Sequence, residues 1–361
     1  MRVESRLVQV ALRGHEVRTP GEPIEGVERL LVVRNDRLGD LLLTLPAIDA
    51  LARTYPGARV GLLVGRELSD IGGMIRPVER LFAVERRAQA VRGAIEAFAP
   101  QLVVAISRRP APAWAAARAG VPHRVGTGYR YYSPLFTRRV DERRRSSTRH
   151  EVEYALSFAH RAGARPAEPD FSLRVPGEAR ERVAAWLSGR GLADRFAIVH
   201  PGTGGSCPAW PLPHYRTLVA SLAALGHAVV VTVGPDDREI VDGWERAGAE
   251  GSVACFRQST PLLAALVERA ALVVSNSTAP IHLAAALGRP ALALHAPWPS
   301  CGPDRWGPYH RAGWALVAES TGAAGWSRRE RECKATVLMA GIAPERVLQA
   351  VVSMLGTGRP V

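Results

Sequence analysis

The stretch VVRNDRLGDLLLTLP, residues 32–46, contains the pattern that decides the fold. It begins with an apolar run typical of a buried strand, crosses a short polar segment, and continues as an apolar helix. Ligands of open α/β sheets bind where a strand passes into a helix in this way. The polar segment carries Asp36 and Asp40 four residues apart, with Arg37 and Gly39 between them.

Apolar runs alternate with helical patterns on both sides of this stretch. The first half of the chain predicts strands at residues 29–34, 58–65, 101–106 and 123–128, and the second half at 196–200, 227–234, 252–256, 271–277 and 290–296. A basic and proline-rich segment separates the two series. Strands joined by helices of this length favour parallel βαβ units with right-handed crossovers.

We therefore expect an α/β protein with two Rossmann-like domains, whose parallel sheets face an interdomain cleft. A chain of 361 residues suits two domains better than one. Residues 1–26 are predicted to form an N-terminal extension, residues 27–170 the first domain, and residues 171–361 the second.

The composition indicates a globular protein with an anionic partner. Hydrophobic residues make up 47% and charged residues 22%, a balance typical of a chain with a real core. The net charge of +13 is carried by arginine with a single lysine, Lys334, and a positive surface favours anionic ligands.

Several classes of protein are disfavoured. No GxGxxG follows the first strand and no GxxxxGK[ST] occurs, which argues against an NAD enzyme and a P-loop NTPase. The sequence has no secretory h-region and no run long enough to cross a membrane. The cysteines lack zinc-ligand or disulfide spacing, which favours a cytoplasmic setting; they are Cys207, Cys255, Cys301 and Cys333.

Asp40 is the first candidate for chemistry, and two interpretations are open. Asp40 can be the N-cap of the helix that follows. Alternatively, it can be a general base that accepts a proton from a nucleophile. Gly39 would then allow a substrate close to the backbone, and Arg37 could face a phosphate.

The second candidate is HPGTGGSCPAWP, residues 200–211, which follows a predicted strand. Its glycines and hydroxyls could bind phosphate oxygens through backbone N–H and side-chain O–H groups. A flexible loop without a ligand is the other interpretation.

The third candidate is SNSTAPIHLAAALGRP, residues 275–290. Ser277 and Thr278 fall at the start of a predicted helix, whose unpaired N–H groups and dipole suit a diphosphate. His282 lies one turn further in, and an interior histidine without a ligand is the alternative for it.

The three loops together resemble the glycosyltransferases of family 9, the ADP-heptose:lipopolysaccharide heptosyltransferases. The likeness runs from about residue 29 to about residue 352 and includes the further motifs DRWGPY and CKATVLMAGIAPERVLQAV. The resemblance implies a GT-B fold, in which the first domain binds the acceptor and the second binds the nucleotide sugar. It also implies an inverting transfer that needs no metal ion and no cofactor, with an ADP-linked sugar as substrate.

The resemblance assigns roles to residues that match the family motifs. Asp40 corresponds to the proposed general base. The residues expected to bind the donor diphosphate are Thr203, Gly204, Gly205, Ser206, Ser277, Thr278, Ala279 and His282. Donors of this kind can stabilise a departing diphosphate.

The chain departs from the family pattern at two places. Pro208 and Ala209 stand where many members have a basic residue before the Trp-Pro pair, and Arg37 is a candidate for the missing cationic contact. The common Asn-Asp-Ser-Gly run is NSTA here. Asp236 is a candidate contact to the nucleotide ribose, with a solvated turn as the alternative.

The sequence thus predicts a glycosyltransferase that transfers heptose from ADP-heptose to a lipopolysaccharide core or related glycolipid. The alternative is a GT-B protein that binds a nucleotide sugar or glycan without catalysis or with another specificity. The basic run at residues 137–149 suggests either a solvated loop or contact with phosphorylated lipid at the inner face of the cytoplasmic membrane. Nucleic acid is not expected as a partner, because only 6% of residues are aromatic and no recognition module is evident.

Overall fold

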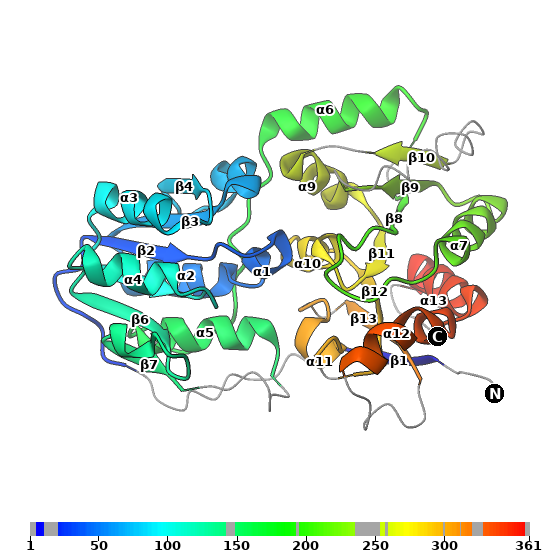
Figure 1. Cartoon of the computed structure of the whole chain (residues 1–361). Helices are drawn as coiled ribbons and strands as arrows, with labels where there is room; N and C mark the ends of the chain where they lie inside the picture. Colours follow the sequence, from blue (N-terminus) through cyan, green and yellow to red (C-terminus); the bar gives the residue numbers. More distant parts are fainter. Residues whose placement is uncertain are drawn as a thin grey trace. The chain divides into compact units, whose positions relative to one another are not determined.

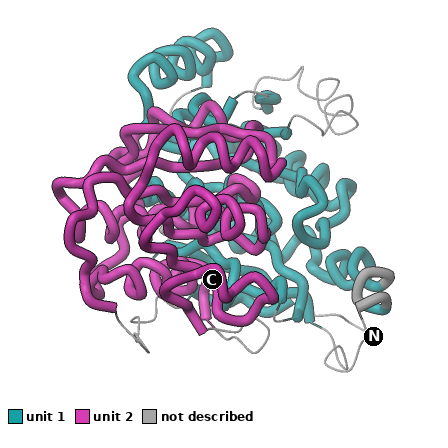
Figure 2. Tube along the Cα trace, turned by 60° about the vertical axis from the view of Figure 1, so that its left-hand side comes forward, with its two compact units in different colours: residues 1–12, 175–361 teal, residues 13–174 magenta. Residues whose placement is uncertain are grey.

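The computed structural model describes nine segments of the chain: residues 5–10, 21–141, 149–192, 195–234, 253–256, 259–298, 300–310, 312–319 and 328–357. The chain divides into two compact units, coloured separately in Figure 2. Residues 13–174 form the N-terminal unit, and residues 1–12 with 175–361 form the C-terminal unit. The units part at residues 12 and 174, whereas the sequence predicted domain limits at 26 and 170.

The N-terminal unit contains a six-stranded parallel sheet in the order β4-β3-β2-β5-β6-β7. This is the doubly wound order, in which the chain changes direction between the first strand and the fourth. The reversal falls between β2 and β5. Figure 1 shows β4, β3 and β2 side by side, on one side of this point. The strands are β2 (Arg29–Val33), β3 (Arg59–Gly65), β4 (Arg80–Val84), β5 (Leu102–Ala105), β6 (His123–Thr127) and β7 (Arg138–Val140).

Helices cover both faces of this sheet. Apolar side chains of α3 and α4 pack with alternate residues of β2, β3 and β5 in one buried cluster. Helices α2 and α5 contact one another, and both carry long buried faces. The helical elements are α1 (Leu38–Leu42), α2 (Leu45–Thr54), η1 (Arg66–Met74), α3 (Ala88–Phe98), α4 (Ala111–Arg118), η2 (Ser133–Leu135) and α5 (Glu151–Arg161).

The C-terminal unit repeats the same topology with one added strand. Its sheet runs β1-β13-β12-β11-β8-β9-β10, and the reversal falls between β8 and β11. All neighbours pair in parallel except β1, which pairs antiparallel with β13. The strands are β1 (Ser5–Gln9), β8 (Ala197–His200), β9 (Val229–Thr232), β10 (Val253–Phe256), β11 (Leu272–Asn276), β12 (Ala291–His295) and β13 (Gly313–Ala318).

A large buried cluster of the C-terminal unit lies between this sheet and α7, α12 and α13. Helix α9 contacts both α6 and α10. The helices are α6 (Gly177–Ser188), α7 (Leu212–Ala224), α9 (Thr260–Arg269), α10 (Ala279–Ala286), α11 (Pro303–Trp306), α12 (Arg328–Ala340) and α13 (Pro344–Thr357). Within the described segments, no single helix is long and apolar enough to span a membrane. The bent pair Lys334–Ala340 and Pro344–Gly356 passes that test only jointly.

The expected helix after the first strand is divided into two. Helix α1 ends at Leu42, and α2 begins at Leu45 with Thr44 as its N-cap. Pro46 has no N–H to donate to the preceding turn, which explains why one helix does not continue through this point. The break leaves a separate first turn, which carries Asp40.

Candidate functional site

The first part of the candidate site lies where β2 ends, at the reversal point of the N-terminal sheet. Helix α1 begins here with Arg37 as its N-cap, and Asp40 is its third residue. The Asp40 carboxylate accepts a hydrogen bond from the backbone N–H of Arg37, with Oδ2 and N 3.4 Å apart. The N-cap interpretation of Asp40 is therefore wrong, because the cap lies three residues earlier.

A buried arginine connects the acidic side chains of this region. The Arg34 side chain is only 1% exposed, and its Nη2 lies 2.7 Å from Oδ1 of Asp40. The same nitrogen lies 3.4 Å from Oε1 of Glu151, and Nη1 lies 3.5 Å from Oδ2 of Asp36. Burial opposes the charge of Arg34, but the carboxylates of Asp40, Glu151 and Asp36 raise its pKa above the ordinary value, so Arg34 remains a cation.

Side-chain hydrogen bonds connect the loop after β2 to the loops that follow β5 and β4. Arg34 also donates to the carbonyl of Ile106, just after β5. The hydroxyl of Ser107 donates to the Asn35 side chain at 2.8 Å. From the loop after β4, Arg86 donates to the Asn35 carbonyl at 2.9 Å. The loop that carries Asp36 and leads to Asp40 is therefore fixed from both sides of the reversal point.

The second part of the candidate site lies at the reversal point of the C-terminal sheet. The loop after β8 contains Gly204 and Gly205, both with positive φ, which side-chain-bearing residues rarely adopt. Ser206 closes a tight turn, because its N–H and its hydroxyl both donate to the carbonyl of Thr203, at 2.9 and 2.7 Å. Residues 204–206 are exposed, so their polar groups are accessible.

Helix α10 begins at the carboxyl end of β11, the neighbour of β8. Thr278 is its N-cap but makes no side-chain capping bond, and Ala279 is its first residue. The Thr278 hydroxyl instead contacts the hydroxyl of Ser275 at 2.9 Å. The Ser277 hydroxyl donates to the carbonyl of Trp306, at the end of α11. Since neither hydroxyl caps α10, the N–H groups of its first turn are not satisfied by them.

Asn276 joins the two donor loops. Its buried side-chain oxygen accepts from the N–H of Trp210 at 3.1 Å and from the hydroxyl of Tyr215 at 2.9 Å. Its Nδ2 donates to the carbonyl of Pro208 at 3.2 Å. The loop after β8 is thus held against the end of β11, after which α10 begins.

The remaining predicted site residues fall in different places. His282 is buried in α10, and its ring lies 6.5 Å from that of Trp306. Arg37 is exposed at the start of α1. Asp236 lies outside the described residues, as do residues 142–148 of the basic run.

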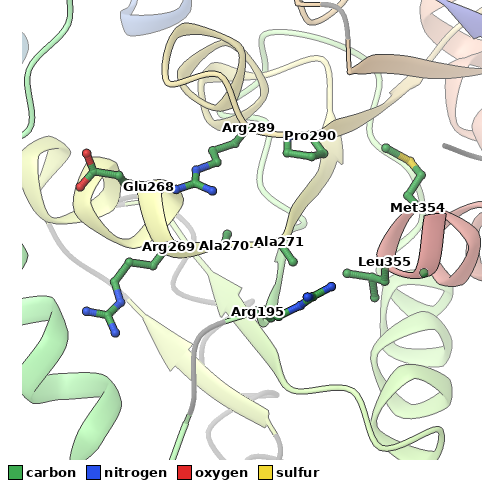
Figure 3. A pocket seen from close by; sticks show the side chains of 10 residues that line it. Arg195, Glu268, Arg269, Ala270, Ala271, Arg289, Pro290, Met354 and Leu355 are labelled. Carbon is green, nitrogen blue, oxygen red and sulfur yellow. The ribbon is translucent and has the colours of Figure 1, made fainter. Parts of the chain in front are cut away.

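A cavity of about 680 Å³ lies near the amino ends of the C-terminal strands, away from the carboxyl ends described above. Its lining residues precede β8, β11 and β12, whereas ligands of open α/β sheets bind beyond the carboxyl ends of the strands. Figure 3 shows the guanidinium of Arg195 beside Leu355, while Arg269 points to the other side. The basic groups do not converge, so this cavity is not the candidate site.

The sequence interpretation missed Arg34, Glu151 and Asn276. Arg34 ends an apolar run, and an arginine at such a position is usually exposed to solvent. Glu151 is distant in sequence, and only its place at the start of a helix could have drawn attention. Within the described segments, no three His, Cys, Asp or Glu side chains gather as metal ligands.

Comparison with known proteins shows the family to which the chain belongs. The sequence profile of glycosyltransferase family 9 (heptosyltransferase) matches residues 111–335, more than half of the chain. The chain therefore belongs to glycosyltransferase family 9. Lipopolysaccharide heptosyltransferase 3 of Escherichia coli K12 is 23% identical over 278 residues, 71% of this chain and 79% of that protein.

Solved structures support the same fold. A glycosyl transferase family 9 protein from Veillonella parvula aligns with a TM-score of 0.77 at 20% identity, over 91% of this chain and 97% of that chain. The E. coli ADP-heptose lipopolysaccharide heptosyltransferase II aligns with a TM-score of 0.74 at 20% identity, over 91% and 99%. The expected GT-B fold with two parallel-sheet α/β domains is confirmed.

Proposed function

We propose that this protein transfers heptose from ADP-heptose to a lipopolysaccharide core or a related glycolipid, with inversion at the anomeric carbon. Family membership supports glycosyl transfer. The donor is suggested by relatives, since one solved heptosyltransferase of E. coli, with a TM-score of 0.69, is described with ADP. The acceptor is suggested by the E. coli lipopolysaccharide heptosyltransferase 3.

The position of Asp40 is the observation that carries this proposal. Its carboxylate lies at the reversal point of the N-terminal sheet, 15% exposed and paired with a buried cation. A carboxylate that is held in place and remains partly exposed can accept a proton from a substrate hydroxyl. Asp40 would take the proton of an acceptor hydroxyl, whose oxygen attacks the anomeric carbon while the nucleoside diphosphate leaves with the bonding electrons.

The donor half of the reaction is assigned to the C-terminal unit. The first-turn N–H groups of α10 and the loop Thr203–Ser206 would bind the diphosphate and stabilise its charge as it leaves. Because backbone N–H groups would bind the diphosphate, this arrangement does not require a basic residue at position 208, which is Pro208 here. His282 and Asp236 stay candidate contacts to the donor.

The function is tested by following release of nucleoside diphosphate from a panel of ADP-, GDP- and UDP-linked sugars with a lipopolysaccharide-core acceptor present. We expect turnover with ADP-heptose. Asp40→Asn should lower kcat by about 10²- to 10⁴-fold, the usual contribution of a general base, with donor affinity by calorimetry unchanged.

Two results would count against this function. Transfer by Asp40→Asn at a rate near that of the wild type would show that another group is the base. Donor binding in the wild type without release of diphosphate would instead support the non-catalytic alternative. Metal independence, cytoplasmic location and contact with an anionic membrane stay predictions, which the effect of EDTA on the rate and cell fractionation would test.

A further inference from the structure

Three carboxylates surround one buried cation beside Asp40. One guanidinium, that of Arg34, faces the carboxylates of Asp36, Asp40 and Glu151, whose side chains are 13%, 15% and 2% exposed. Asp40 and Glu151 contact the same nitrogen, Nη2, at 2.7 and 3.4 Å. Carboxylates that share one guanidinium repel one another, and the cation between them offsets that repulsion.

We propose that Arg34 is the positioning residue of the general base: its guanidinium holds the Asp40 carboxylate in one orientation, and Glu151 holds the guanidinium in turn. The inference rests on the proposed function only for the role of Asp40 as base. Arg34 is buried to 1% exposure behind Asp40, so it acts through Asp40 rather than on a substrate.

The geometry explains why the guanidinium has a single orientation. Its two terminal nitrogens are used on three sides: the carbonyl of Ile106, the carboxylate of Asp36, and the pair Asp40 and Glu151. A planar guanidinium presents donors in a fixed fork, which an ammonium group on a flexible chain does not. Asp40 is therefore bound to a cation that cannot rotate away.

Other charged groups face this cluster from the surrounding elements. Arg86, after β4, donates to the carbonyl of Asp36 at 3.2 Å. Tyr132 lies near enough for the charge of Asp36 to act on it, although burial is the larger cause of its raised pKa. The backbone N–H of Arg37 contacts Asp40, while its side chain is exposed. Arg34 remains the side chain that the described contacts place against Asp40.

Two substitutions are expected to shift the pH dependence of kcat/KM in opposite directions. Arg34→Gln removes the cation, so the acid limb of the kcat/KM profile should move to higher pH by about one to three units, with kcat lowered. Glu151→Gln keeps an acceptor for Arg34 but removes a negative charge near Asp40, so the acid limb should move to lower pH by up to about one unit. Arg34→Lys should restore part of the loss.

The titration of Asp40 is measured directly, without turnover, by carbon-detected NMR of protein labelled at aspartate carboxyl groups, with Asp40→Asn for assignment. The carboxyl should titrate with the same opposite shifts in the two variants. If Asp40→Asn retains activity while these shifts occur, the base assignment fails and the positioning role stands.

Arg53→Gln is the matched control, because it breaks another arginine–aspartate pair of 2.7 Å in the same unit, that of Arg53 with Asp49. It should leave the Asp40 titration unchanged. Equal or absent shifts in Arg34→Gln and Glu151→Gln would overturn the proposal. If Arg34→Gln does not fold, Glu151→Gln alone decides, and an unchanged or upward shift there would contradict it.

Discussion

Arg37 is an exposed side chain at the start of α1, beside the carboxylate proposed as the base. The residues that the structure describes offer its guanidinium no carboxylate within 4.0 Å. Its charge is therefore available to a ligand, in contrast to that of Arg34. This contrast assigns two neighbouring arginines of one motif to two tasks, one inside the protein and one facing water.

If Arg37 contacts the donor phosphates, Arg37→Glu should raise the KM for the nucleotide sugar by about tenfold or more, since a charge-assisted hydrogen bond contributes about 1.5–3 kcal/mol. Steady-state kinetics with varied donor would measure this. Arg92→Glu makes the same change of charge on α3 and should leave the KM unchanged. Equal effects of both substitutions would show that the overall positive charge of the protein, and not a direct contact by Arg37, affects donor binding.

The residues of this motif differ in how far the sequence predicts them. Asp40 was assigned to chemistry from its motif and its place after a strand, and it does lie at the reversal point. Arg34 could not be assigned, because the stabilisation of a buried cation depends on partners as distant in sequence as Glu151. Contacts of that kind become visible only when the fold brings the elements together.

At the scale of elements, Asn276 is the connection between β11, the loop after β8, and α7. Asn276→Ala would leave the N–H of Trp210 and the hydroxyl of Tyr215 buried without their partner. Unpaired buried groups cost about 1–3 kcal/mol each, so we expect the free energy of unfolding to fall by about 2–5 kcal/mol. Donor affinity should fall as well, because both donor loops lose their connection.

Urea unfolding and calorimetry with the donor would measure both effects. Tyr215→Phe is the matched comparison, since it removes one hydrogen bond of the same side chain and should cost about 1 kcal/mol. Burial raises the pKa of Tyr215 well above its ordinary value, so its hydroxyl remains a donor throughout the accessible pH range. A wild-type stability for Asn276→Ala would contradict the assigned role.

The strands that the sequence predicted are those with strong apolar runs, and the structure has a strand at each of these places. The strands it did not predict include β1, β4 and β7, which are three of the four edge strands; the fourth, β10, has an apolar run and was predicted. An edge strand is half solvated, so its sequence lacks a continuous apolar signal; Arg138–Val140 has two arginines in three residues. Strand β13 was also missed.

At the scale of the whole molecule, each unit contains one buried histidine with a lowered pKa. Burial is the main cause for both His160 in α5 and His295 in β12, and it lowers each pKa to about 4. In the unfolded chain the pKa of histidine is about 6.5. As the pH falls below 6.5, the unfolded state binds protons at these two histidines and the folded state does not, which favours unfolding. The contribution of these histidines to the free energy of unfolding is therefore complete above pH 6.5. It is lost progressively between pH 6.5 and about pH 4.

Each histidine should reduce the free energy of unfolding by up to about 3 kcal/mol across this window, from about 1.4 kcal/mol per pKa unit. Urea unfolding at a series of pH values would measure the decline. His160→Gln should flatten it for the N-terminal unit and His295→Gln for the C-terminal unit. A slope unchanged by either substitution would show that other groups cause the acid sensitivity.

Strand β1 affects how the protein is made. Ser5 pairs with Ala318, so β1 leaves the ribosome long before the strand with which it pairs. During synthesis the N-terminal unit can fold while β1 is still unpaired, and the C-terminal sheet closes last. Without β1, the edge of β13 would be open to strands of other chains, so deletion of residues 1–12 is expected to lower the yield of folded protein during expression.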